Sequence, residues 1–215
     1  MTRLTRLLYN LRMADFDNRD RWLVGPGDVL FLRTKDKPGG LIRFWQWLTD
    51  RGDYYPVNHV VVHVGRYCPG CEHEYVVSAE PPRVRVRRLW DMLLDACGAV
   101  YVAHAVNPAT ALAVARCAVR NVGRWYDFVG VLGHVVYKLW GKYPELKFAK
   151  YCSELASECA GVRPTRQTPA SLAVALSVLP DWRLGFLRDD NGTLFCDVEG
   201  ISLSRVLRDI GGVAV

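Results

Sequence analysis

The chain has 215 residues, half of them apolar, and carries 28 Lys and Arg against 22 Asp and Glu, for a formal net charge of +6. This composition excludes a disordered protein, and the length suits one domain with a substantial hydrophobic core. The positive charge would suit an anionic partner, but the sequence contains no recognisable nucleic-acid motif, so we expect no specific nucleic-acid partner.

No apolar run reaches the roughly 18 residues that a membrane span requires, and no signal-peptide pattern follows the first residues. We therefore expect a cytoplasmic protein, or one that a phage encodes or a secretion system delivers. The seven cysteines are an odd number and lack the spacing of a disulfide framework. We expect them to be mostly reduced thiols.

Residues 1–24 form a basic amphipathic segment. Its leucines recur at helical spacing with arginines between them: Leu4, Leu7, Leu8 and Leu11. Such a helix can lie on an anionic membrane surface through residues 1–12, or it can pack its leucines on the domain itself. A Gly-Pro-Gly-Asp turn ending at Asp28 then predicts a short apolar strand over residues 29–32.

The β-branched run from Asn58 to Gly65 predicts a strand. Alternation places His59 and His63 on one face and the valines on the other. The two histidines are four residues apart, about 13 Å at roughly 3.3 Å per residue, so at most one can serve a single nucleophile.

The turn from Cys68 to Cys71, with His73 just beyond it, has the spacing of half a zinc site. No second cysteine pair completes it, so the alternatives are a plain hairpin turn, a local disulfide, or zinc with a remote fourth ligand. A plain turn is the preferred interpretation, and we expect no metal and no cofactor.

Three further strands are expected over residues 75–80, 83–88 and 100–106, and Glu80 lies at the end of the first. Helices are expected from Pro108 to about 123 with Cys117 in the core, from Tyr126 onward, over 152–160, and from the Thr168-Pro169 pair to about 178. The order predicts an α+β fold, an antiparallel sheet or small barrel with helices packed on one side. Residues 25–180 form the domain, and 181–215 form a C-terminal extension packed on it.

The stretch from Tyr151 to Gly161 predicts a short helix with Cys152 in its first turn. The positive end of the helix dipole favours thiolate there, where pKa values of roughly 3.5–7.5 replace the usual value of about 8.5. The alternative is that Cys152 is a buried small hydrophobe, the commonest role of a free cysteine.

A cysteine hydrolase needs a thiolate, a histidine that carries the proton, and a third polar group that fixes the imidazole. Candidates occur in the order His59, Glu80, Cys152. Five short motifs surround them: Gly27–Phe31, His59–Gly65, Ala79–Pro81 with Val84, Trp125–Phe128 and Tyr151–Leu155. In this order, over about residues 25–175, the chain resembles the circularly permuted NlpC/P60 papain-like cysteine hydrolases. This group includes the YiiX-like proteins and, more distantly, lecithin:retinol acyltransferase.

The resemblance implies a permuted papain-like fold with Cys152 as nucleophile, His59 as general base and then acid, and Glu80 as the group that orients His59. His59 is preferred to His63 because it matches the family's histidine at the start of this strand. Asp28 and Tyr126-Asp127 match motif positions, and we expect them to serve turn geometry and packing.

The activity implied by the resemblance is cleavage of an amide bond in a peptide of the cell-wall type, through an acyl-enzyme. The alternatives are a lipid ester or thioester hydrolase or acyltransferase at a membrane surface, and a non-catalytic binding module on the same fold. The expected partner is accordingly a peptide or acyl substrate.

Overall fold

The structure is a computed structural model that describes residues 24–34, 57–66, 73–97, 100–127, 149–163 and 167–188. Its strands are β1 (Val29–Leu32), β2 (His59–Arg66), β3 (Glu74–Glu80), β4 (Arg83–Arg88), β5 (Val100–Ala105), β6 (Trp125–Tyr126), β7 (Ala149–Lys150) and β8 (Trp182–Arg188). Its helices are α3 (Leu89–Asp95), α4 (Pro108–Arg120), α6 (Cys152–Cys159) and α7 (Pro169–Ser177).

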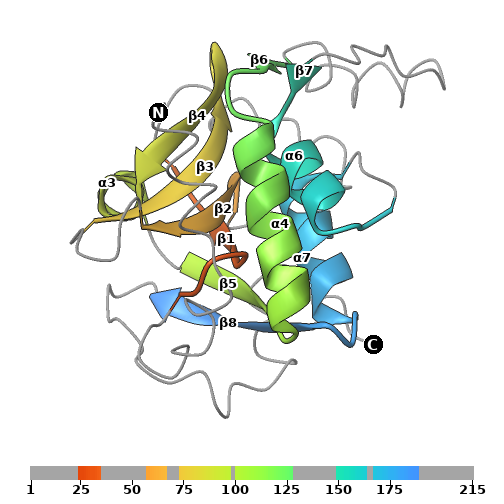
Figure 1. Cartoon of the computed structure of the whole chain (residues 1–215). Coiled ribbons are helices and arrows are strands. Elements are labelled where there is room, and N and C mark those ends of the chain that lie inside the picture. Colours follow the sequence, from red (N-terminus) through yellow and green to blue (C-terminus); the bar gives the residue numbers. More distant parts are fainter. Residues whose placement is uncertain are drawn as a thin grey trace, which may run out of the picture.

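The strands form one sheet in the order β7-β6-β4-β3-β2-β1-β5-β8 (Figure 1). All neighbours run antiparallel except β6 and β7, which are parallel. The expected α+β class is therefore confirmed. Strand β8 pairs with β5, so the sheet continues into the segment that the sequence assigned to the C-terminal extension.

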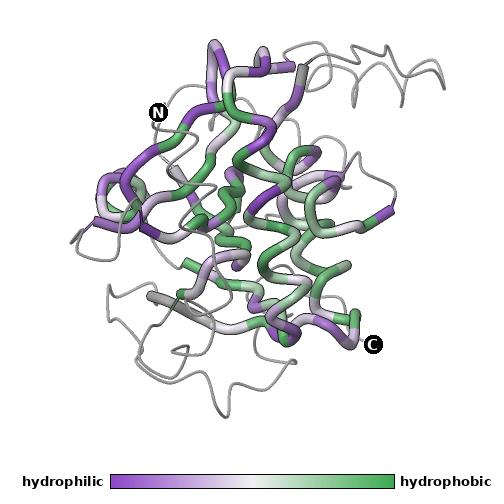
Figure 2. The backbone as a smooth tube through the Cα atoms, viewed as in Figure 1, coloured by the Kyte–Doolittle hydropathy of each residue, from purple (hydrophilic) through white to green (hydrophobic). Residues whose placement is uncertain are grey.

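Alternation along β2 divides the core into two layers. Val60, Val62 and Val64 pack in one apolar cluster with buried residues of α4, α6 and α7. Val61 belongs to a second cluster on the opposite face, which includes Met92 of α3. Figure 2 shows hydrophobic residues recurring along the strands in the middle of the sheet and along the helices that lie beside them. The expectation that helices pack on one side is correct for α4, α6 and α7 and wrong for α3, a short helix that the sequence analysis did not predict.

The helix boundaries follow the expected signals. The Asn107 side chain accepts a hydrogen bond from the N–H of Ala109 at 2.8 Å, and Thr168 accepts one from Ser171 at 3.1 Å, each just before a proline at the start of a helix. Gly161 follows α6 with φ of +71°, the left-handed conformation that commonly ends a helix.

One expected helix boundary is wrong. Trp125–Tyr126 form strand β6, held between β4 and β7 by backbone pairing, because β-pairing on both sides outweighs the local helical pattern. Several expectations lie outside the described residues: the helix expected from Tyr126 onward, beyond Asp127; residues 1–23 of the N-terminal segment; the Cys68–Cys71 turn; and the C-terminal extension after residue 188.

Gly27 provides a stability test of the contact between the turn before β1 and α4. Its φ is +92°, and a Cβ built there would overlap the carbonyl of Ala111. Gly123 has φ of +93° with no atom within 4 Å of such a Cβ, so it isolates the backbone strain. We expect Gly123→Ala to cost roughly 1–2 kcal/mol and Gly27→Ala roughly 1–3 kcal/mol more, measured by urea unfolding. Equal losses would contradict the close packing of this turn on α4.

Candidate active site

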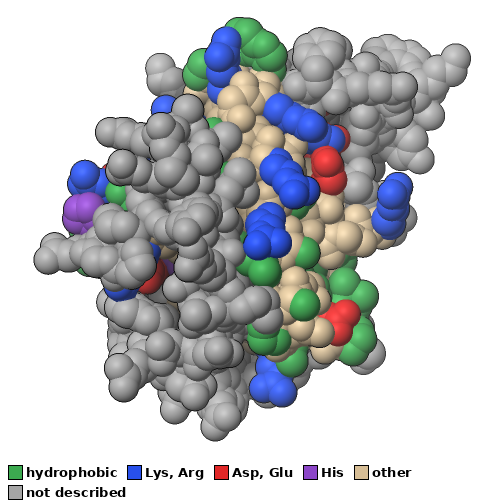
Figure 3. Space-filling model, viewed as in Figure 1, with side chains coloured by type: hydrophobic (Ala, Val, Ile, Leu, Met, Phe, Trp, Pro, Cys, Tyr) green, Lys and Arg blue, Asp and Glu red, His purple; other side chains and the backbone are tan. Residues whose placement is uncertain are grey.

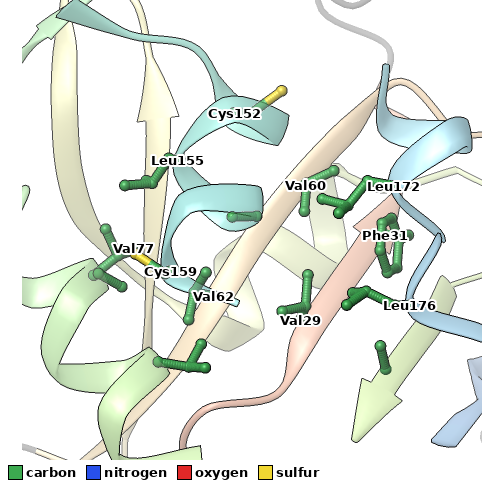
Figure 4. Packing of buried hydrophobic residues seen from close by; sticks show 14 of the residues in the cluster. Val29, Phe31, Val60, Val62, Val77, Cys152, Leu155, Cys159, Leu172 and Leu176 are labelled. Atoms are coloured by element: carbon green, nitrogen blue, oxygen red, sulfur yellow. The ribbon is translucent and has the colours of Figure 1, made fainter. Parts of the chain in front are cut away.

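Cys152 is the first residue of α6 and only 2% exposed. Tyr151 precedes it in an extended conformation, and its side chain makes no capping hydrogen bond to the helix. The first amides of a helix have no intrahelical acceptor and form the positive end of the helix dipole. Figure 4 shows the Cys152 sulfur directed away from Leu155 and the other labelled core side chains. Cys152 therefore lies in the buried apolar cluster, at a helix start that offers N–H donors.

The Trp125–Asp127 motif fixes the backbone that leads into α6. Strand β6 pairs with β7, Trp125 with Ala149 and Tyr126 with Lys150, and the N–H of Asp127 donates to the carbonyl of Lys150 at 3.2 Å. The packing role expected of this motif is therefore to position Lys150, two residues before Cys152.

The charges around the start of α6 are paired. The Lys150 ammonium lies 3.1 Å from Oε1 of Glu154 and 2.7 Å from Oε2 of Glu158. Burial lowers the pKa of Lys150, but the hydrogen bonds and charges of Glu158 and Glu154 outweigh it and raise this pKa overall. Lys150 thus offsets the carboxylate of Glu154, which would otherwise disfavour a thiolate two residues away.

His59 is the first residue of β2, and its imidazole is held by two residues of β3. Nε2 lies 2.8 Å from Oγ of Ser78 and 4.0 Å from Oε1 of Glu80. The sequence analysis predicted the approach of Glu80 but missed Ser78, which is fully buried and is the nearer partner. Period-2 alternation from Glu80 was the signal that could have found it, since Ser78 lies on the same face of the strand.

Glu80 is bound mainly by arginines of β4. Arg85 donates from Nε to Oε2 at 2.9 Å and also contacts this oxygen through Nη2, and Nη1 of Arg87 lies 3.4 Å from it. Burial raises the pKa of Glu80, but hydrogen bonds from Arg85 and Ser78 and the charges of His59 and Arg85 lower it overall. Glu80 is therefore an ionised carboxylate at neutral pH.

Helix α6 packs against β2 and β3, with Cys152 toward the Val60 end of β2 and Cys159 beside Val62 (Figure 4). Alternation directs Val60 toward the helix and directs His59 toward Ser78 and Glu80 on the opposite face. The structure thus brings His59 and Glu80 together, and it sets Cys152 at the same end of β2 on the other side of the strand.

The second histidine of β2 belongs to a different cluster. Nε2 of His63 lies 3.0 Å from Oε2 of Glu74, whose other oxygen lies 3.4 Å from Arg66. This contact lies farther along β2 from His59, so the two histidines belong to separate clusters.

Asp28 serves the turn, as expected. Its Oδ2 accepts the N–H of Gly25 at 2.6 Å, closing the turn before β1. The same oxygen lies 2.8 Å from Nδ1 of His104 on β5, a contact that the sequence did not indicate because the two residues are 76 positions apart.

The expectation of reduced thiols is wrong for two cysteines. Cys117 of α4 and Cys159 of α6 form a disulfide, whereas Cys97 and Cys152 are not disulfide-bonded. The two helices pack against each other, so residues 42 apart in sequence meet. Disulfides persist mainly in oxidising compartments, so this bond weakens the reasoning that favoured the cytoplasm.

A comparison with the models of known protein families and with curated protein sequences found no match. Among the described residues, no helix is long and apolar enough to cross a membrane. The same part of the chain contains no group of three or more His, Cys, Asp or Glu suited to a metal ion. His73 is exposed, and its zinc alternative depends on cysteines outside the described residues.

The lowered pKa of Glu80 predicts a pH-dependent contribution to stability. A carboxyl whose pKa is lower in the folded state stabilises above its unfolded value, here 4.5, and this contribution disappears as the pH falls through the folded value. We expect the stability gap between the wild type and Glu80→Gln to be largest near neutral pH and to shrink from about pH 4.5 downward. Urea unfolding at a series of pH values measures it, and a gap independent of pH would contradict the assignment.

The disulfide predicts a redox-dependent melting temperature. Removing a bond that closes a loop of this length costs roughly 2–4 kcal/mol. We expect the Cys117→Ser/Cys159→Ser double variant to melt at lower temperature than the wild type and to lose its response to reductant. Cys97→Ser is the matched control and should keep that response. A wild-type melting temperature unaffected by reductant would count against the bond.

Proposed function

We propose that the chain is a thiol-dependent hydrolase of the permuted papain-like type, with Cys152 as nucleophile and His59 as general base and acid. One observation carries the proposal. Cys152 begins a helix that packs on β2, and the first residue of β2 is an imidazole already fixed by Ser78 and Glu80.

The positions of the resembling motifs support the same interpretation. Gly27–Phe31 enters the strand beside β2, Ala79–Pro81 ends the strand that supplies Ser78 and Glu80, and Trp125–Asp127 positions the start of α6. Gly27–Phe31 therefore begins beside His63 and runs along β2 toward His59, whereas the other two motifs contribute to the His59 partners and to the start of α6.

The proposed reaction proceeds through a thioester. The thiol gives its proton to Nδ1 of His59, and the sulfur attacks the substrate carbonyl, whose oxygen becomes an oxyanion near the first N–H groups of α6. His59 then protonates the leaving nitrogen as the C–N bond breaks. Water attacks the thioester while His59 takes its proton, and the acid is released as the thiol re-forms.

This reaction requires the Cys152 thiol and the His59 imidazole to meet at the end of β2. Val60 lies between the helix and the sheet, whereas His59 is the terminal residue of the strand. An imidazole at a strand end can reach past the last backbone pair, a position that a mid-strand histidine such as His63 does not have. The proposal thus uses His59 because of its place in the strand.

The first candidate substrate is a peptide amide, as the resemblance implies. A second candidate is a lipid ester or thioester at an anionic surface, favoured by a basic face on α4. Arg116 and Arg120 of α4 and Arg124 just after it are exposed at four-residue spacing, and Trp125 is 51% exposed beside them. Figure 3 shows Lys and Arg side chains following one another over this face.

The basic face contains charges without acidic partners. Helix α4 has no acidic residue, and no ion pair among the described residues involves Arg116, Arg120 or Arg124. Arginine next to an exposed tryptophan suits the boundary between lipid headgroups and acyl chains. Residues 1–12 remain the other basic segment proposed for such a surface.

The decisive experiment is alkylation of the folded protein with iodoacetamide across pH, with mass spectrometry locating the modified cysteine. We expect Cys152 to react below about pH 7 and to require higher pH in His59→Ala. Cys97 is the control thiol. If Cys152 reacts no faster than Cys97, or only after unfolding, the thiol is structural and the binding-module alternative gains support.

The same protein then distinguishes the substrates. Incubation with wall-type peptides or with acyl esters, followed by intact-mass measurement, should reveal a thioester adduct on the wild type and none on Cys152→Ala. An adduct from acyl esters that depends on anionic vesicles, and weakens when Arg116 and Arg120 are changed to Gln, would select the lipid substrate.

A further inference from the structure

We propose that the chain docks on an anionic membrane through a tip made of four arginines and one tryptophan. The tip comprises Arg83 at the start of β4, Arg116 and Arg120 of α4, and Arg124 with Trp125 after that helix. Docking is a binding event that does not require the proposed reaction. Its consequence for that reaction, a lipid substrate in place of a peptide, rests on the proposed function.

Backbone hydrogen bonds hold the two parts of the tip together. The N–H of Val84 donates to the carbonyl of Arg124 at 2.9 Å, and the N–H of Gly123 donates to the carbonyl of Val84 at 2.8 Å. The N–H of Tyr126 donates to the carbonyl of Pro82 at 3.0 Å. The turn between β3 and β4 and the segment that leaves α4 therefore lie side by side at one end of the molecule (Figure 1).

Trp125 combines exposure with a stacked cation. The residue is 51% exposed, and the guanidinium carbon of Arg83 lies 4.2 Å from the centroid of its ring. Pro82, next to Arg83, is exposed as well. A tryptophan side chain has an apolar body and a polar N–H, so it suits the boundary between acyl chains and headgroups. The stacked arginine places a cation at the same depth, where the lipid phosphates lie.

The charges of the tip have no acidic counterpart. Residues 108–126 contain no Asp or Glu, and Asp127 directly after them is buried. The four arginines are exposed, and none of them makes an ion pair within the described part of the chain. Glu80, at the other side of the turn, is already bound by Arg85 and Arg87. At an anionic bilayer, each such arginine contributes about fivefold in affinity.

An anionic membrane fits the tip better than a nucleic acid does. Surfaces that bind single strands stack successive bases on several aromatic rings along a basic groove. The tip has one aromatic ring, and Arg83 covers one of its faces. A membrane requires only an aromatic side chain at the boundary and cations at headgroup level.

Docking through the tip places the start of α6 near the bilayer. Trp125 pairs with Ala149 of β7, which precedes Cys152 by three residues. Adjacent strands are about 4.8 Å apart and an extended chain advances roughly 3.3 Å per residue, so the backbone of Cys152 lies within roughly 15 Å of that of Trp125. A disulfide also joins α6 to α4, the helix that carries Arg116 and Arg120. The proposed lipid-binding surface thus adjoins the helix of the proposed nucleophile.

The test is sedimentation of the full chain with vesicles, either of phosphatidylcholine alone or of an equimolar mixture with phosphatidylserine. We expect binding to the anionic vesicles only, weakened by added salt. Arg120→Gln should lower the partition coefficient about fivefold, and Arg116→Gln/Arg120→Gln roughly 25-fold. Arg183→Gln, which removes an exposed arginine of β8 at the opposite edge of the sheet, is the matched control and should leave binding unchanged.

Fluorescence quenching by lipids with brominated acyl chains measures the insertion of Trp125. We expect anionic vesicles that contain these lipids to quench the wild type more strongly than Trp125→Phe. Trp125→Ala should lower the partition coefficient roughly tenfold. Trp90 of α3 is 62% exposed, so Trp90→Phe is the matched control and should keep the quenching of the wild type.

Three results would overturn the tip: no binding of the wild type to anionic vesicles, binding that Arg116→Gln/Arg120→Gln leaves unchanged, or binding lost only when the arginines within residues 1–12 are changed to Gln. An oligonucleotide bound in place of the vesicles, and weakened by Arg120→Gln, would assign the tip to nucleic acid instead.

Vesicle binding and thiol chemistry fail separately. Cys152→Ala should bind anionic vesicles like the wild type, because the tip does not include the thiol. An unreactive Cys152 with vesicle binding retained would refute the hydrolase and support the tip. A reactive Cys152 without vesicle binding would refute the tip and leave the hydrolase standing.

Discussion

The alternation of side chains along β2 is the constraint on which the rest of the structure depends. One set of residues, Val60, Val62 and Val64, binds the helical layer, while the other set carries His59 and His63 to the opposite face. A change of register by one residue would exchange the two sets, placing the imidazoles under the helices and moving the valines into the second buried layer on the other face. The core and the candidate site therefore specify each other, and any sequence change that weakens the valine packing also displaces the imidazole.

The polar groups on the second face are organised as separate pairs along the sheet. His59 has Ser78 and Glu80, His63 has Glu74, and His104 has Asp28. Buried charges are tolerated only when they are paired, and each pair joins neighbouring strands, so these contacts also help to fix register. What distinguishes His59 is its place at the strand terminus beside α6. A contact between a histidine and an acidic residue in the middle of a strand has a structural role. At the end of a strand, as for His59, the same kind of contact becomes a candidate for catalysis.

The disulfide and the charge pairs around α6 fix the helix that begins with Cys152. Cys159 anchors the end of α6 to α4, and Lys150, just before the helix, pairs with Glu154 of its first turn and Glu158 of its last turn. The helix that begins with Cys152 is thus fixed at both ends. A rigid nucleophile suits catalysis, since misplacement by about 1 Å can cost 10²-fold in rate. Helix α4, which carries the basic face, packs against α6 in the same helical layer. What the basic face binds therefore distinguishes a peptide substrate from a lipid substrate.

The sequence by itself determined several of the local elements and their types, although it missed α3 and assigned Tyr126 to a helix. Three signals act through neighbouring residues: the β-branched run at 59–65, the Thr168-Pro169 pair and Gly161 after α6. The boundaries that they predict therefore agree with those of β2, α7 and α6. It also indicated Cys152 at a helix start and His59 at a strand start. Only the tertiary structure decided what these residues meet. The contacts of Ser78, the arginine clamp on Glu80, the pairing of Trp125–Tyr126 and the Cys117–Cys159 bond all join strands or helices whose approach depends on the packing of the whole sheet. The local sequence pattern does not show which strands and helices come together, because the free energy of burial and strand pairing is gained only when segments distant in sequence meet.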